Sequence, residues 1–302
     1  MDIAIIGTGA IGGYYGVRLA LAGHRVHFLA HSEYEAIKAG GLRVDSYLGE
    51  FAVPAPLVYD DPAKLPPCDL VCVTVKATAN AEVFGKLGSA LKPDGSIILM
   101  QNGFGWEPEL ARLYPQAKLY AGLCFICSFR EAPGVVRHTA YGSVTVAPYQ
   151  AGQDGQDGAE ALRRLFEEAG VEATALADAV SARFHKLVWN IPYNGLTTVL
   201  GCTTAELAAD PAARHAARRL MDEVVEAAAA CGVAISERFV NQMEANTDNM
   251  PAYNPSMRLD HLAGRPLEVE AMFRNVIACA AEHGYQMRRA ELLADELDFL
   301  SA

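Results

Sequence analysis

The sequence predicts an α/β protein in which a doubly wound parallel sheet is followed by an all-helical domain. Short apolar runs alternate with helical patterns through the first half of the chain, and a glycine-rich turn follows the first of these runs. After Ser181 the strand patterns fade, and long helical patterns rich in Ala, Leu and Glu take over. We therefore predict an α/β domain over residues 1–177 and a helical domain over residues 178–302.

The expected strands are short and rich in Val and Ile, as in strands buried on both faces of a parallel sheet. They cover residues 3–6, 25–29, 70–75, 96–100, 119–123 and 143–147. A helical pattern over residues 10–22 supplies the first crossover between parallel strands. The polar, Gly-rich residues 150–158 are typical of a surface loop. In the second half, helices are expected over residues 212–231 and 267–283, where Gly232 and Gly284 suit the C-caps.

Composition and charge exclude several classes of protein. The 302 residues are 51% hydrophobic, and 25 Lys and Arg against 36 Asp and Glu give a formal net charge of −11. This negative charge argues against binding to nucleic acid or to an anionic membrane surface. No run approaches the ~20 apolar residues of a membrane span, and Asp2 stands where a secretory signal would carry Lys or Arg. We expect a cytoplasmic protein.

Seven cysteines at irregular spacing do not indicate a disulfide framework. Cys124 and Cys127 have CxxC spacing, but no second pair follows and their neighbours are large and apolar. We interpret these residues as buried, reduced thiols and predict no metal site. Redox or metal chemistry at this pair is the alternative.

A GxGxxG motif lies between the first expected strand and the first expected helix. It consists of Gly7, Thr8, Gly9, Ala10, Ile11 and Gly12. The first glycine permits a tight turn, the second lets a pyrophosphate approach the backbone, and the third allows close packing of helix on strand. The helix N-terminus adds N–H groups and partial positive charge. The motif predicts a Rossmann-type dinucleotide site, with a purely structural turn as the alternative.

The end of the second expected strand indicates which dinucleotide is bound. NAD enzymes place an acid there for the ribose 2′-hydroxyl, whereas this chain has His31 and Ser32, which can donate hydrogen bonds to a 2′-phosphate. We therefore expect NADP(H). In the alternative, this is a solvated turn and Glu33 binds the ribose of NAD.

A polar stripe begins the helical half. Lys186, Asn190 and Asn194 are spaced by four residues, so in a helix they point broadly the same way. Apolar residues flank them, which favours a partly buried stripe lining a cleft over a solvated face. A lysine at such a place can donate a proton to an oxygen that gains charge. Pro192 is expected to kink or interrupt the helix.

Several motifs, in order along nearly the whole chain, resemble the ketopantoate reductase (2-dehydropantoate 2-reductase) family. They are GTGAIGG near the N-terminus, Thr74-Val75-Lys76, Gln101-Asn102-Gly103, the segment with Lys186, Asn190 and Asn194, Pro255-Ser256-Met257 with Asp260, and Gly264-Arg265-Pro266-Leu267-Glu268. The resemblance implies NADPH-dependent reduction of 2-dehydropantoate to pantoate, in pantothenate biosynthesis.

The resemblance also implies catalytic roles for two residues. Lys186 matches the general acid that protonates the carbonyl oxygen as hydride reaches C2, and Glu268 matches the acid that hydrogen-bonds the substrate. For Glu268 the alternative is a solvated helix face shared with Glu270.

Substrate and cofactor contacts follow from the same resemblance. Asn190, Asn194 and Ser256 match residues that hold the substrate's carboxylate and hydroxyl groups, Asn102 matches an asparagine between cofactor and substrate, and Lys76 matches a cofactor-side lysine. The alternatives are an N-cap role for Ser256 and a plain surface position for Lys76. Asp260 and Arg265 are expected to form a structural pair.

One departure from the family pattern concerns the cofactor. His31 stands where the family often has Arg, which implies a less strict preference for NADP. Two other functions stay open: reduction of another small 2-keto acid by the same mechanism, and a non-catalytic NADP-binding sensor. A homodimer is compatible with the helical domain, but no segment has the distinctive pattern of an interface.

Overall fold

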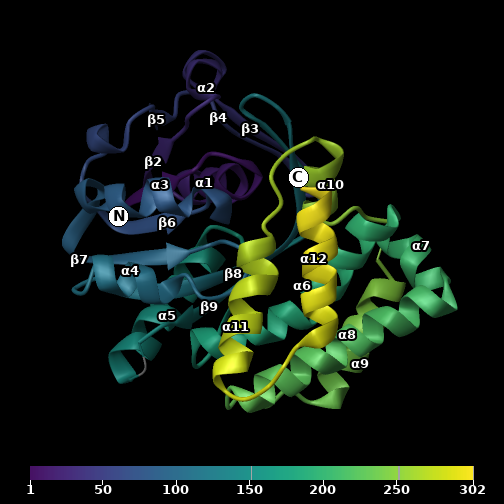
Figure 1. Cartoon of the computed structure of the whole chain (residues 1–302). Coiled ribbons are helices and arrows are strands. Elements are labelled where there is room, and N and C mark those ends of the chain that lie inside the picture. The colour runs from purple at the N-terminus through teal and green to yellow at the C-terminus, as the bar shows by residue number, and fades with distance from the viewer. Residues whose placement is uncertain (151, 251, 302) are drawn as a thin grey trace. The chain divides into compact units, whose positions relative to one another are not determined.

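The computed structural model describes residues 1–150, 152–250 and 252–301. It divides into two compact units: unit 1 comprises Met1–Asn102 and Trp106–Ala179, and unit 2 comprises Gly103–Gly105 and Val180–Ala302. In Figure 1, unit 1 is coloured mainly purple to teal and unit 2 green to yellow. Each unit is described by itself below.

A ten-stranded sheet forms the centre of the described part of unit 1, in the order β4-β3-β9-β8-β7-β6-β1-β2-β5, with β10 beside β9. The strands are β1 (Asp2–Ile6), β2 (Arg25–Leu29), β3 (Leu42–Ser46), β4 (Gly49–Val53), β5 (Leu57–Tyr59), β6 (Cys68–Val73), β7 (Leu91–Leu99), β8 (Lys118–Ala132), β9 (Val135–Pro148) and β10 (Ala173–Ala175).

The strands from β5 to β8 in this order are all parallel. The apolar runs predicted β1, β2, β6, β7 and the start of β8, but not the short strand β5. The sheet as a whole is mixed, because β8 and β9 form a long antiparallel hairpin and β3 pairs with β4 antiparallel. Only the inner parts of β8 and β9 were predicted. Their outer parts are more exposed and more polar, so they lack the continuous apolar pattern of a buried strand.

Helices and short 3-10 turns cover both faces of this sheet. They are α1 (Ala10–Leu21), α2 (Tyr34–Gly40), η1 (Pro62–Lys64), η2 (Ala77–Ala79), α3 (Asn80–Val83), η3 (Phe84–Ala90), α4 (Glu107–Leu113) and α5 (Gln153–Glu168). In β1, Ile3 and Ile5 pack into the core on one face, whereas Ala4 and Ile6 pack into the core on the other. Both faces of the central strands are therefore buried.

The predicted surface loop over residues 150–158 is wrong from Gln153 onwards. Ala151 lies outside the described residues, and α5 already begins at Gln153. The helix starts this early because its later turns bury Ala159, Leu162, Leu165 and Phe166 against the sheet. Tertiary packing of those turns stabilises a polar first turn that has poor helix propensity of its own.

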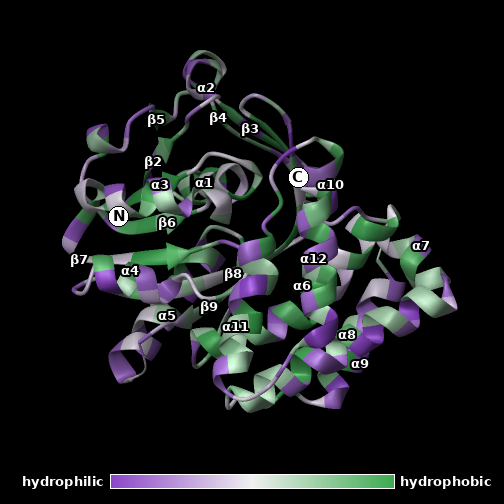
Figure 2. Cartoon of the chain, viewed as in Figure 1, coloured by the Kyte–Doolittle hydropathy of each residue, from purple (hydrophilic) through white to green (hydrophobic). Residues whose placement is uncertain are grey.

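Unit 2 is helical throughout its described residues outside the connecting loops. Its helices are α6 (Ala179–Leu200), α7 (Thr204–Ala209), α8 (Pro211–Ala230), α9 (Glu237–Asp248), α10 (Ser256–Leu262), the π-helix η4 (Glu270–Arg274), α11 (Asn275–Glu282) and α12 (Arg288–Leu300). Thr203 forms a capping box with Glu206, and Asp210 caps α8. Figure 2 shows the alternating polar and apolar surfaces of α8. Gly232 and Gly284 follow α8 and α11 with positive φ, as predicted.

Helix α6 continues through Pro192, so the expectation that this proline interrupts the helix is wrong. Proline removes one N–H donor from the helix, but Pro192 is buried and Ile191 and Tyr193 on either side belong to the core of unit 2. Burial along a 22-residue helix offsets the loss of one hydrogen bond.

No helix among the described residues is long and apolar enough to cross a membrane.

Two buried histidines make the stability of unit 1 depend on pH. His27 lies in β2 beside the Tyr59 hydroxyl, and His138 in β9 beside the Ser46 hydroxyl. Burial lowers the pKa of each imidazole below 6.5. The unfolded chain therefore binds protons at a higher pH than the folded one, and stability is lost as pH falls from about 6.5 towards the folded pKa values.

We expect the free energy of unfolding of unit 1 to fall by about 1 kcal/mol between pH 7.5 and pH 5.5. Urea unfolding in a Trp189→Phe background, in which Trp106 fluorescence reports on unit 1, measures it. His27→Gln and His138→Gln should each reduce the pH dependence, whereas His215→Gln, at an exposed position of α8, should not. A pH dependence unchanged in both buried-site variants would contradict this explanation.

Candidate active site

The glycine-rich turn lies at the carboxyl end of β1, which pairs with β2 on one side and β6 on the other. The N–H groups of Gly7 and Thr8 donate to the Leu29 carbonyl oxygen, and the Thr8 hydroxyl donates to the same oxygen at 2.9 Å. The Thr74 hydroxyl at the end of β6 donates to the carbonyl oxygen of Gly7 at 2.7 Å. The turn is thus fixed beyond the carboxyl end of β1, between the neighbouring strands β2 and β6. This is the usual ligand position in such sheets.

The three glycines of the turn meet different surroundings. Gly7 has φ +103°, which favours glycine. A Cβ at Gly12 would collide with the Gly7 carbonyl oxygen, so that glycine is required for packing. A Cβ at Gly9 would meet no atom within 4 Å. The open space at Gly9, before the N-terminus of α1, fits the approach of a pyrophosphate to the backbone.

The residues after β2 bear on the two alternatives for ribose binding: His31 and Ser32 for a 2′-phosphate, or Glu33 for the ribose of NAD. His31 and Ser32 are exposed there. Glu33 is buried, accepts a hydrogen bond from the Gly134 N–H at 3.0 Å and pairs with Arg130. The carboxylate of Glu33 is therefore engaged within unit 1.

Two further loops leave the same edge of the sheet, after β6 and β7. Lys76 is exposed and precedes η2, and Asn102 is half-buried after β7. Gln101 joins the two loops, because its Nε2 donates to the Val75 carbonyl oxygen at 2.8 Å and to Asn80 Oδ1 at 2.6 Å. Sequence reasoning did not find this role of Gln101 and Asn80, since nothing in the spacing signals an amide pair between two loops.

The segment Gly103–Gly105 belongs to unit 2 and packs on the π-helix η4. The Phe104 N–H donates to the Ala271 carbonyl oxygen at 2.8 Å, and Asn275 Nδ2 donates to the Phe104 carbonyl oxygen at 2.8 Å. A Cβ at Gly103, which has φ +96°, would collide with the Ala271 carbonyl oxygen. Asn102 therefore directly precedes a segment in which both the N–H and the carbonyl oxygen of Phe104 are hydrogen-bonded.

The predicted polar stripe lies on α6 in unit 2. Lys186 is half-buried, whereas Asn190 and Asn194 are buried among the apolar residues of this helix. Lys186 is the only lysine in the sequence from residue 178 to 302, where every other permanent cation is an arginine. A lysine ammonium can give up a proton, but an arginine guanidinium stays protonated in proteins.

The two buried asparagines differ in their partners. Asn194 Oδ1 accepts from the Met257 N–H at 3.2 Å and from the Ser256 hydroxyl at 3.4 Å. Asn190 Nδ2 has no hydrogen-bond partner in the described structure. A buried amide donor without a partner is costly, so Asn190 is suited to a polar ligand that supplies an acceptor.

Ser256 and Glu268 are placed by α10 and by the turn before η4. Ser256 is the first residue of α10 and not its N-cap, which is Pro255. Glu268 is buried, whereas Glu270 is exposed, so the solvated acid of this pair is Glu270. Asp260 and Arg265 form the expected structural pair at 2.9 Å.

The CxxC cysteines lie on β8, and none of the seven cysteines forms a disulfide bond in the described part of the chain. Cys127 is buried, and burial raises the pKa of its thiol to about 11. A thiol with such a pKa is protonated near neutral pH and is a poor nucleophile.

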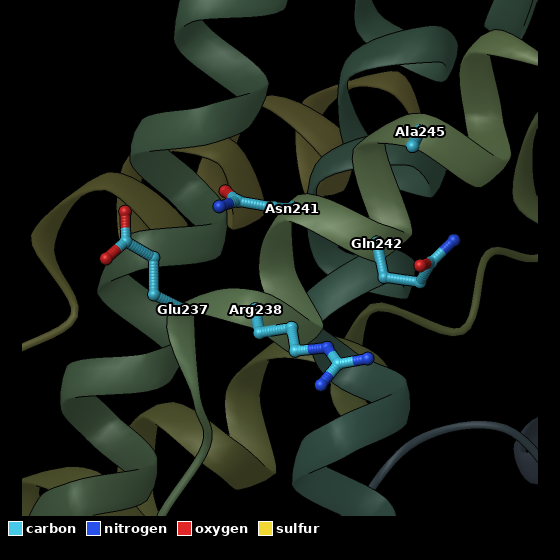
Figure 3. A pocket seen from close by; sticks show the side chains of 5 residues that line it. All are labelled: Glu237, Arg238, Asn241, Gln242 and Ala245. Atoms are coloured by element: carbon cyan, nitrogen blue, oxygen red, sulfur yellow. The ribbon is translucent and has the colours of Figure 1, made fainter.

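A surface hollow along α9 is unrelated to these residues. It is lined by Glu237, Arg238, Asn241, Gln242 and Ala245, all from one helix (Figure 3). Arg218 of α8 binds Asn241 Oδ1 at 2.8 Å and lies 3.9 Å from Glu237. These contacts make Glu237 and Asn241 part of the packing of α8 on α9.

Comparison with known proteins matches both units. The family model described as "Ketopantoate reductase PanE/ApbA" matches residues 3–151, and its C-terminal counterpart matches residues 178–301. A 2-dehydropantoate 2-reductase of Nostoc sp. is 40% identical over 300 residues, covering 98% of this chain and 94% of its own.

Solved structures agree. The crystal structure of 2-dehydropantoate 2-reductase from Geobacter metallireducens is 39% identical with a TM-score of 0.93, and the match covers 99% of each chain. A ternary structure of D-mandelate dehydrogenase with NADH and anilino(oxo)acetate has a TM-score of 0.90 at 22% identity, covering 100% of this chain and 98% of its own. At that identity the likeness shows the fold alone.

The glycine turn yields a paired prediction. Gly12→Ala should lower the free energy of unfolding of unit 1 by about 1–3 kcal/mol, because the methyl group overpacks the turn. Gly9→Ala should change it by less than about 0.5 kcal/mol and weaken dinucleotide binding at least about tenfold, since its methyl group fills the space of the phosphates. Urea unfolding and calorimetric titration with NADPH measure the two quantities. Unchanged NADPH affinity in Gly9→Ala would contradict the assignment.

The asparagines of α6 provide a second matched pair. Asn194→Leu should destabilise unit 2 by about 1–3 kcal/mol, because the buried Met257 N–H loses its acceptor. Asn190→Leu should leave stability unchanged or raise it, because it removes a buried donor that has no partner. Urea unfolding in a Trp106→Phe background, followed by Trp189 fluorescence, compares the two variants. Equal destabilisation would show that Asn190 has a structural partner.

Proposed function

The chain belongs to the ketopantoate reductase family, and from that premise we propose that it reduces 2-dehydropantoate to pantoate with NADPH, with Lys186 as the general acid. It is an oxidoreductase of a nicotinamide-dependent family that acts on small keto acids. The main support for this reaction and for the role of Lys186 is the polar stripe on α6. In this stripe, the only lysine of residues 178–302 precedes two buried asparagines.

The proton in this reaction comes from Lys186. When bound, the nicotinamide cofactor supplies the hydride that reaches C2 of the keto acid. Negative charge then develops on the carbonyl oxygen, and a positioned ammonium group both stabilises that charge and transfers its proton. An arginine at this position would supply charge without a transferable proton.

The amides and hydroxyl beside Lys186 hold the substrate. The Nδ2 of Asn190 donates to a carboxylate or hydroxyl oxygen, which satisfies a donor that is otherwise buried without a partner. The Oδ1 of Asn194 is occupied by Met257 and Ser256, so Asn194 turns its amide donors to the ligand and keeps α10 in place. Glu268, which is buried just before η4 begins, accepts a hydrogen bond from the substrate hydroxyl.

Unit 1 binds the cofactor through the glycine turn, and the end of β2 supports NADP(H) over NAD(H). The alternative acid for the ribose, Glu33, is held by Arg130 and the Gly134 N–H. His31 and Ser32 remain as exposed donors for a 2′-phosphate. Lys76 and Asn102 follow the carboxyl ends of β6 and β7, where ligands of such sheets bind, and complete the proposed cofactor contacts.

The main alternative is a different small 2-keto acid reduced by the same residues. The structure of D-mandelate dehydrogenase with NADH and anilino(oxo)acetate has the same fold, which supports this alternative. A non-catalytic NADP sensor is less well supported, because a sensor has no need of a proton donor beside a buried amide without a partner. The product pantoate would place the enzyme in pantothenate biosynthesis in the cytoplasm.

We expect rapid NADPH oxidation with 2-dehydropantoate and slower oxidation with other small 2-keto acids or with NADH. Lys186→Ala and Lys186→Arg should each lower kcat by about 10²–10⁴-fold while NADPH affinity stays unchanged. Steady-state kinetics with a panel of keto acids measures this, with Lys118→Ala, an exposed position on β8, as the matched control.

Preferential turnover of another keto acid would keep the mechanism and change the substrate. Full activity in Lys186→Arg would contradict the role of Lys186 as proton donor. The absence of turnover with every keto acid, despite NADPH binding, would favour the sensor.

A further inference from the structure

Three side chains with metal-binding atoms meet where two helices of unit 2 end. Cys231 is the C-cap of α8, Cys279 lies in α11, and His283 is the C-cap of α11. One ligand atom from each lies within 4.8 Å of the other two. None of the three belongs to the proposed substrate or cofactor contacts, so this group is independent of the proposed function.

The two sulfur atoms are separated by the distance that a tetrahedral metal requires. Cys231 Sγ and Cys279 Sγ lie 3.7 Å apart. Two thiolates at about 2.3 Å from Zn²⁺, at the tetrahedral angle, lie about 3.8 Å apart. A histidine nitrogen at about 2.0–2.1 Å from the metal would lie about 3.6 Å from each sulfur, and the ligand atom of His283 now lies within 4.8 Å of both sulfurs.

One hydrogen bond determines which ring nitrogen of His283 is available to a metal. Its Nδ1 donates to the Cys279 carbonyl oxygen at 2.8 Å, four residues earlier on the same face of α11. This hydrogen bond leaves Nε2 as the nitrogen with a free lone pair, and a second-shell bond of this kind is usual for metal-binding histidines. The exposed position of His283 also gives ions access from solvent.

The electrostatic surroundings favour a cation. Cys231 lies at the C-terminus of α8, and Cys279 and His283 lie in the last turn of α11; both helix ends carry partial negative charge. A divalent cation bound here would neutralise two thiolates and the partial charges of the helix ends together.

We propose that Cys231, Cys279 and His283 bind a thiophilic divalent cation of the Zn²⁺ type, with water as the fourth ligand. Binding releases the two thiol protons to solvent, so that two thiolates, a neutral imidazole and the dication carry no net charge. The bound ion joins the C-terminal ends of α8 and α11 through the half-buried sulfurs, which pack against the core of unit 2. The site could not be predicted from a sequence motif, because Cys231 and Cys279 are 48 residues apart.

Titration of the reduced, chelator-treated full chain with Co²⁺ tests the proposal. A tetrahedral site with two thiolates should give sulfur-to-cobalt charge-transfer bands at one equivalent of metal, and Zn²⁺ should displace the Co²⁺. Cys279→Ala should lower the affinity for Zn²⁺ by at least about 100-fold, and His283→Ala by about 10–100-fold. Cys202→Ala, at another half-buried cysteine of unit 2, is the matched control and should bind as the wild type does.

Zn²⁺ should also raise the thermal midpoint of the wild type by several degrees but not that of Cys279→Ala. Circular dichroism and NADPH turnover of each variant establish that it is folded. Cobalt spectra that persist in Cys279→Ala, or no charge-transfer band in the wild type, would overturn the proposal. It would equally be overturned if glutathione disulfide joined Cys231 and Cys279 in a disulfide while metal affinity stayed undetectable.

Discussion

Parallel pairing of β2, β1, β6 and β7 is the constraint on which unit 1 depends. Because parallel strands end at the same edge of the sheet, residues far apart in the sequence come together there: the glycine turn after β1, Thr74 after β6 and Gln101 after β7. Hydrogen bonds from Thr74 to Gly7 and from Gln101 to Val75 then fix the loops. The proposed cofactor contacts all follow strands that end at this edge, and Gly9 leaves open space there for the phosphates.

In unit 2 the corresponding constraint is a long buried helix that carries polar side chains. Most of α6 packs into an apolar core. Each buried polar group on it therefore lowers the stability of the fold unless it is hydrogen-bonded. Asn194 is paired with α10, Thr197 and Thr198 donate to carbonyl oxygens one turn earlier, and Asn190 Nδ2 has no partner among the described residues. This departure from full pairing, beside the only lysine of residues 178–302, supports a substrate site.

Sequence reasoning succeeded where a local pattern determines the structure. The GxGxxG turn, the parallel strands and the four-residue spacing of Lys186, Asn190 and Asn194 are all local. It failed where contacts between segments far apart in the sequence determine the secondary structure. Examples are the polar first turn of α5 and the long hairpin of β8 and β9. The Gln101–Asn80 pair and the contact of Phe104 with η4 were also out of reach, since each joins segments that no motif connects.

Calorimetric titration with pantoate in the presence of NADP⁺ measures whether the buried amide of Asn190 binds the substrate. A hydrogen bond to a charged group contributes about 1.5–3 kcal/mol, so Asn190→Leu should weaken pantoate binding by about 10–100-fold and leave NADP⁺ affinity unchanged. Pantoate binding as tight in Asn190→Leu as in the wild type would contradict the account.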